Sequence, residues 1–166
     1  MNNENDQTAE RFLVALEGWV QELMALSQLP LANPTKLNFE DYTKFRDKKE
    51  ECLSFMVIIE RRIGQGRGDR KERLTEQFDR LVVAIWSILM QGSFGFLTVL
   101  CERSQLPIGT QHVFEQELKT LYEAEKALEQ DRYQKFLPAS LVEQREKAKQ
   151  ILNITIEKAP KLLKMG

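Results

Sequence analysis

The chain has 166 residues, of which 42% are hydrophobic and 30% charged, and its formal net charge is −1. This length fits one domain, residues 1–166, that can bury a core, and the near-zero charge gives no general attraction to nucleic acid or acidic lipid. The N-terminal residues MNNENDQTAE are polar and acidic, unlike a secretory signal, so we expect a cytoplasmic protein.

Two amphipathic helices are predicted first, over residues 7–28 and 39–63. In the first, apolar residues recur at steps of three and four, as in a helix with one buried face. In the second, the charged segment RDKKEE (residues 46–51) predicts a solvated turn near Lys48. Gly64 should end this helix because glycine tolerates the left-handed conformation, while Pro30 and Pro34 stiffen the connection between the two helices.

The third predicted helix, residues 70–103, contains the stretch 81–101, which has no charged side chain. Twenty-one uncharged residues could span a bilayer, so a single-span membrane protein is a minor alternative. Against it, small and polar residues recur along one side of the helix, at Arg73, Gln77, Arg80, Ala84, Ser87, Gln91, Gly95, Thr98 and Glu102. This pattern favours one continuous central helix of a bundle, with a kink at Gly92-Ser93 as the competing outcome.

We define the small-residue stripe as Ala84, Ser87, Gln91, Gly95 and Thr98. The stripe could face water, a neighbouring helix or a second copy of the chain, and the sequence leaves these three alternatives open.

Two more helices are predicted over residues 110–131 and 140–157, with the segment 131–139 as a loop and Pro160 ending the last helix. Residues 1–6 and 160–166 are expected to be loose tails. The Glu-rich segment 119–131 predicts a solvated helix surface. No segment alternates as strands do, so the predicted fold is all-α: a four- to five-helix, mostly antiparallel bundle around a long central helix.

A basic segment surrounds a glycine-rich turn between the second and third helices. Its six cationic residues are Arg61, Arg62, Arg67, Arg70, Lys71 and Arg73. They could bind phosphate, nucleic acid or an acidic partner near the start of the third helix. The alternative is a solvated bundle end, partly neutralised by Asp69, Glu72, Glu76 and Asp79. The turn GQGRGD lacks the lysine and final residues of a phosphate-binding loop, and no strand precedes it.

The chain has few histidine and cysteine residues, the types that most often catalyse reactions or bind metals. His112 is the single histidine, and Cys52 and Cys101 stand in apolar runs, as expected of reduced, buried thiols. We therefore predict no enzyme activity, no metal and no cofactor. The first hypothesis is a helical-bundle protein that binds a protein partner, as an adaptor, assembly factor or small subunit. The second is a nucleic-acid- or phosphate-binding module that uses the Arg61–Arg73 segment.

Overall fold

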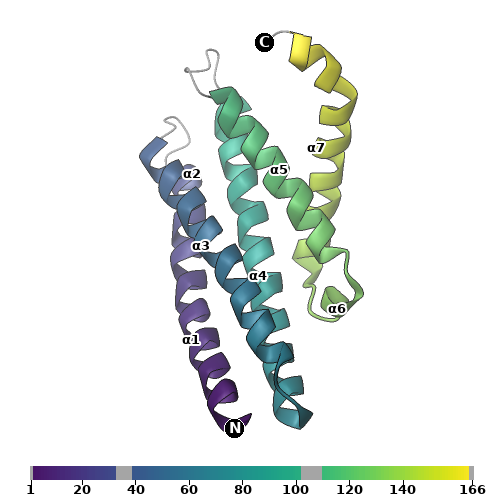
Figure 1. Cartoon of the computed structure of the whole chain (residues 1–166). Helices are drawn as coiled ribbons and strands as arrows, with labels where there is room; N and C mark the ends of the chain where they lie inside the picture. Colours follow the sequence, from purple (N-terminus) through teal and green to yellow (C-terminus); the bar gives the residue numbers. More distant parts are fainter. Residues whose placement is uncertain (1, 33–38, 102–109, 165–166) are drawn as a thin grey trace.

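The computed structural model describes residues 2–32, 39–101 and 110–164. In this part of the chain there are five long helices and two single-turn helices. They are α1 (Asn2–Ser27), α2 (Leu29–Ala32), α3 (Phe39–Gly64), α4 (Gly68–Cys101), α5 (Thr110–Leu128), α6 (Asp131–Gln134) and α7 (Ala139–Lys164). Successive long helices run in opposite directions (Figure 1), so the predicted all-α antiparallel bundle is confirmed.

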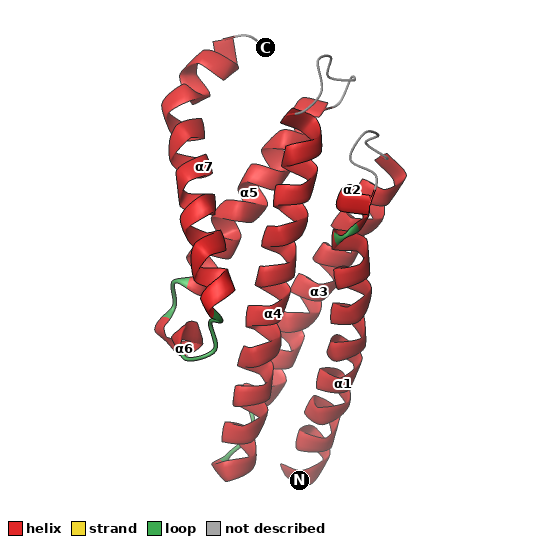
Figure 2. Cartoon of the chain, turned by 180° about the vertical axis from the view of Figure 1, so that it is seen from behind, coloured by secondary structure: helices red, strands yellow, loops and turns green. Residues whose placement is uncertain are grey.

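Helix α4 is the spine of the molecule. It packs against each of the other six helices in the described residues, with α1 and α3 on one side and α5 to α7 on the other. The reason lies in its sequence, since apolar side chains surround most of its circumference. Ile85, Leu89 and Met90 are fully buried, and Val82 and Phe96 are nearly so. Seen from behind (Figure 2), α4 lies in front of α3 and α5, and one side of it is left uncovered between α1 and α7.

Helix α4 is continuous from Gly68 to Cys101, through Gly92 and Ser93, as the predicted central helix requires. The predicted end at Arg103 lies outside the described residues. Over 34 residues, α4 is about 51 Å long. By length and composition, residues 68–99 could cross a membrane, but 72% of their most apolar window is buried in the bundle. Packing against the other helices therefore accounts for this apolar surface.

A glycine in α4 allows close packing of the central aromatic residues. The Phe45 ring lies 5.4 Å from Phe96, and Tyr42 meets Phe96 edge-on at 5.0 Å between centroids. A Cβ atom on Gly92 would lie only 2.5 Å from Cζ of Phe45 and 3.3 Å from Cβ of Ser27. Gly92 thus lowers the helix propensity of α4 but leaves room for the Phe45 ring.

Several helix ends differ from the prediction. Helix α1 begins at Asn2 and α7 extends to Lys164, so both expected tails are largely helical. Pro160 does not end α7: a helix can pass through proline by bending, and α7 curves near its C-terminal end in Figure 1. Helix α3 does end at Gly64, but the left-handed glycine of this turn is Gly68, with φ +73°, because the chain reverses there.

The predicted loop 131–139 contains the ion pairs of Arg132 with Glu60 and Asp79, which we call the clasp. Its first residues form α6, and Arg132 donates hydrogen bonds to Glu60 of α3 and Asp79 of α4, each at 2.6 Å. Burial lowers the pKa of the Arg132 guanidinium, but the hydrogen bonds to these two carboxylates outweigh burial and raise the pKa above its usual value. Arg132 thus links the connection between α5 and α7 both to α4 and to α3 on the other side of α4.

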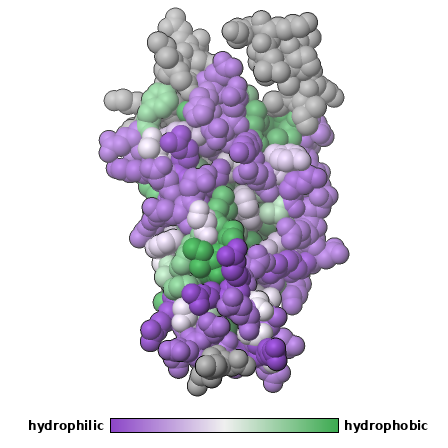
Figure 3. Space-filling model, in the orientation of Figure 1, coloured by the Kyte–Doolittle hydropathy of each residue, from purple (hydrophilic) through white to green (hydrophobic). Residues whose placement is uncertain are grey.

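The surface of the front face is mostly hydrophilic, with apolar side chains gathered near its middle and others towards its upper end (Figure 3). Among the described residues, the most exposed large apolar side chains are Val14 of α1, Val57 of α3 and Tyr122 of α5, at 70%, 59% and 52%. They come from three different helices.

Candidate binding face of helix α4

The six residues of the basic segment lie where α3 turns into α4. Exposed side chains are Arg61, Arg62, Arg67 and Arg73, whereas Arg70 and Lys71 are half-buried. The segment therefore does not present six free cations on one surface.

The N-terminal half of α1 supplies partners to this segment. Nη2 of Arg70 lies 2.9 Å from Oε1 of Glu10, and Nε lies 3.9 Å from Asp6. Nη1 of Arg62 donates to Oδ1 of Asn5 at 3.2 Å. The prediction placed the neutralising acids on the third helix. They come instead from α1, because antiparallel packing brings its acidic start beside this turn.

Two of the predicted neutralising acids are engaged elsewhere. Asp79 binds Arg132, and Glu76 binds Arg80 one helical turn further along α4. Arg61, Arg67 and Arg73 form no ion pair with a described residue. Of these three, only Arg73 is on the uncovered side of α4 and lines a groove there.

The small-residue stripe faces largely towards solvent. Gln91 and Thr98 are exposed and Ala84 and Ser87 are half-buried, whereas Gly95 is buried. Residues that precede the stripe on the same side of α4, namely Arg73, Gln77 and Arg80, are exposed as well. We define the α4 face as the side of α4 from Arg73 to Ser87 together with two grooves that flank it, which are described next.

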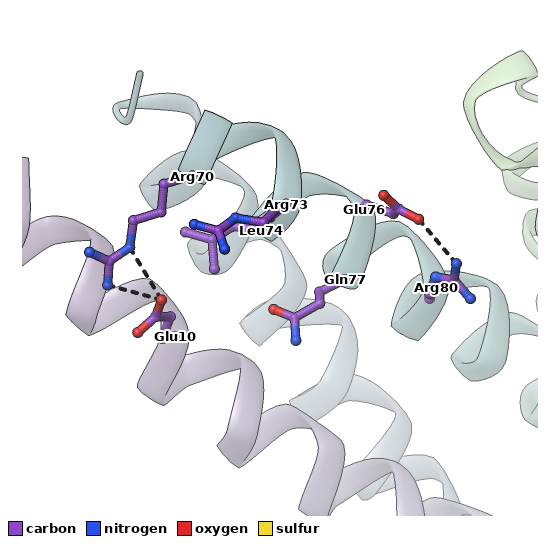
Figure 4. Close-up of a pocket in the computed structure, with 7 residues that line it drawn as sticks. All are labelled: Glu10, Arg70, Arg73, Leu74, Glu76, Gln77 and Arg80. Carbon is purple, nitrogen blue, oxygen red and sulfur yellow. Dashed lines mark hydrogen bonds and ion pairs between the residues drawn. The ribbon is translucent and has the colours of Figure 1, made fainter. Parts of the chain in front are cut away.

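The first groove lies between α1 and α4 and has a volume of about 480 Å³. Figure 4 shows its lining: Glu10 from α1 opposite Arg70, Arg73 and Gln77 from α4, with the ion pair of Glu76 and Arg80 at one end. Leu74 lies at the base of this groove, where it is buried with only 3% of its surface exposed.

The second groove lies between α4 and the segment that connects α6 to α7, and its volume is about 560 Å³. Val83, Ala84 and Ser87 line the α4 side, with Phe136 and Pro138 opposite. Two cations lie over the Phe136 ring, the Arg80 guanidinium at 5.0 Å and the Lys135 ammonium at 4.9 Å from its centroid. Both grooves share Glu76 and Arg80, so they adjoin along α4.

A buried polar cluster joins α3, α4 and α5 inside the bundle. Glu117 of α5 is 2% exposed and accepts a hydrogen bond from Ser93 Oγ of α4. Lys49 of α3 is 5% exposed and donates from Nζ to Thr120 Oγ1 at 2.8 Å. The Tyr42 hydroxyl is buried and has no hydrogen-bond partner of good geometry within the described residues.

Burial sets the electrostatics of this cluster. Loss of water raises the pKa of Glu117, while hydrogen bonding and the Lys49 ammonium act in the opposite direction. Burial and the neighbouring Glu117 carboxylate also raise the pKa of Tyr42. Neither groove is lined by these residues, so the cluster positions helices rather than facing a ligand.

Three members of the cluster were not predicted from the sequence. Lys49 was assigned to a solvated turn, and Glu117 and Thr120 were left out of the α5 core. The available signal was register, since positions 113, 117, 120, 121 and 124 follow the three-and-four spacing of one helix face. Lys48, beside Lys49, does reach the surface, but its ammonium lies 5.3 Å above the Trp19 ring and 2.7 Å from Glu22.

The remaining reactive residues stand apart from the α4 face. His112 is exposed near the start of α5. Cys52 is buried as expected, and burial raises the pKa of its thiol to about 11; the Cys101 side chain lies outside the described residues. No group of three or more potential metal ligands occurs in the described part of the chain.

Comparison with family models, curated proteins and solved structures finds no match to this chain.

Proposed function

We propose that this protein is a non-enzymatic helical-bundle module that binds another protein through the α4 face, as an adaptor, assembly factor or small subunit. The observation that supports it best is that the central helix leaves one side uncovered, flanked by two adjoining grooves. A helix that is apolar over most of its circumference is normally buried, and the small side chains of Ala84 and Ser87 would let another helix approach closely.

The proposal is tested by blocking the face without disturbing the core. Ser87→Trp places a large side chain in the second groove, and Ser54→Trp places the same side chain on the exposed surface of α3. Tagged wild type and both variants are used to recover partners from the native host, with and without nuclease. We expect one protein partner to be retained by wild type and Ser54→Trp and lost from Ser87→Trp, regardless of nuclease. Equal recovery by both variants would contradict the use of this face.

A second candidate function is nucleic-acid or phosphate binding through the basic segment. It is favoured by the exposure of Arg61, Arg67 and Arg73 without ion-pair partners among the described residues. Changing these three to Ala, and leaving the Arg70–Glu10 pair intact, should abolish RNA binding and its salt dependence. Absence of RNA binding by the wild type at low salt would end this alternative.

A further inference from the structure

We infer that the occupant of the α4 face is an acidic amphipathic helix of the partner protein. This inference rests on the proposed function and specifies the chemistry of the partner.

The charge of the face supports an acidic occupant. Its two grooves are lined by four cations and two carboxylates, a balance of +2 on a chain whose net charge is −1. Glu10 and Glu76 are each bound to an arginine, which leaves Arg73 and Lys135 without a carboxylate partner among the described residues.

The ring of Phe136 gives an independent reason for an anion at this position. Arg80 and Lys135 approach the ring from two different segments, and each lies about 5 Å from its centroid. Cation–π attraction holds both there. The charge of Arg80 is already balanced by Glu76 at 3.0 Å, whereas the Lys135 ammonium has no carboxylate partner among the described residues, so a carboxylate of the partner would pair with Lys135 beside the ring.

The shape of the face supports a helix rather than an extended strand. From Arg73 to Ser87, α4 rises about 21 Å, the length of a helix of about 14 residues. The walls of the grooves are helices and a short connection, and they present no strand edge to hydrogen-bond an extended backbone. A helix satisfies its own backbone groups and can place apolar side chains against the half-buried Phe136 and Ala84 of the second groove, as in helix-in-groove recognition.

The same charges disfavour two other occupants. A second copy docked through the same face would bring two surfaces of balance +2 together. A nucleic acid would find no open ring on which bases could stack, because Phe136 is half-buried.

The test uses the full-length chain and three fluorescent probes in anisotropy titrations at low and high salt. The first probe is an amphipathic helical peptide of about 18 residues, with Leu along one face and Glu along the other. The second replaces every Glu with Lys, and the third is single-stranded oligouridylate. We expect binding of the Glu peptide alone, weakened at least about tenfold in the double variant Arg73→Glu, Lys135→Glu. The double variant Lys44→Glu, Lys147→Glu, with both changes on exposed surface of α3 and α7 outside the two grooves, is the matched control and should bind as the wild type does.

Equal or tighter binding of the Lys peptide or the RNA would overturn the inference, as would failure of the Glu peptide to bind. An unchanged affinity in the double variant, with its circular dichroism intact, would also overturn it. If the Glu peptide fails while Ser87→Trp still loses the host partner, the protein-binding function stands and only the acidic-helix partner is wrong. If Ser87→Trp and Ser54→Trp behave alike, the proposed function itself fails.

Discussion

Replacing Gly92 with Ala should destabilise the protein, although Ala is the better helix former. Gly92 lies in the middle of α4, where an added Cβ would lie 2.5 and 2.7 Å from two ring atoms of Phe45. Real Cβ atoms do not approach carbon atoms so closely, so either the ring or the helix must move. Phe45 is fully buried and packed against Phe96, which leaves the ring little freedom to turn away.

Two opposing terms set the size of the effect. Helix propensity favours Ala over Gly by about 1 kcal/mol. Overpacking of a tight core costs roughly 1–3 kcal/mol, and a rigid aromatic neighbour puts this site in the upper half of that range. We therefore expect the Gly92→Ala variant to lose about 1–2 kcal/mol of unfolding free energy. Gly18 of α1 is the matched control, because a Cβ there meets nothing within 4 Å. Gly18→Ala should gain roughly 0.5–1 kcal/mol.

The assay is urea unfolding of wild type, Gly92→Ala, Gly18→Ala, Phe45→Leu and the double variant of Gly92 and Phe45. Phe45→Leu removes the ring atoms that meet the new Cβ. The double variant should therefore lose less unfolding free energy than the two single variants lose together, by about 1 kcal/mol or more. Constant urea m-values would show that the unfolded states are comparable. If Gly92→Ala stabilised the chain as Gly18→Ala does, or if the double variant were simply additive, close contact with Phe45 would not be the reason for glycine at this position.

Three further predictions address the core and the clasp. Glu117→Gln should flatten the pH dependence of the unfolding free energy. Burial raises the pKa of Glu117 in the folded state above its unfolded value, so protonated Glu117 stabilises the protein at low pH. This contribution is lost as the pH rises through the folded-state pKa, and Gln cannot titrate. Each tenfold difference in proton affinity amounts to about 1.4 kcal/mol, and urea unfolding at a series of pH values measures the slope; an unchanged slope would mean that Glu117 is not its source. Asp79→Asn should cost about 1–3 kcal/mol because Asp79 is buried against Arg132, whereas Glu76→Gln at the exposed pair with Arg80 should cost under about 0.5 kcal/mol; similar losses in thermal unfolding would refute the clasp. Leu89→Asp buries an unpaired charge and should abolish the helical circular dichroism signal, while a folded variant with an altered oligomeric state in light scattering would place Leu89 at an interface instead.

The sequence predicted the architecture well because the main signals are local. The three-and-four spacing of apolar residues determines helices, and the uncharged segment 81–101 marked α4 as the helix with the most neighbours. The continuous course of α4 through Gly92-Ser93 was predicted for the right reason, since a neighbouring helix does press close at Gly92.

Predictions failed where the outcome depends on long-range packing. Arg70 and Glu10 are sixty residues apart in sequence, so their ion pair follows only from the antiparallel docking of α1 on α4. The burial of Lys49 and Glu117 likewise requires three helices to meet at one level. The uncovered side of the small-residue stripe depends on which neighbours α4 acquires, and no single-helix pattern contains that information.

The position of α4 between two groups of helices has a consequence for the order of folding during synthesis. Helices α1, α3 and α4 are the first three long helices in the sequence and pack on one another, so they can assemble as soon as residue 101 has left the ribosome. Until α5 follows, the side of α4 that includes Ser93 and its apolar neighbours stays open to water. Docking of α5, with Glu117 against Ser93 of α4 and Thr120 against Lys49 of α3, then covers this nascent surface.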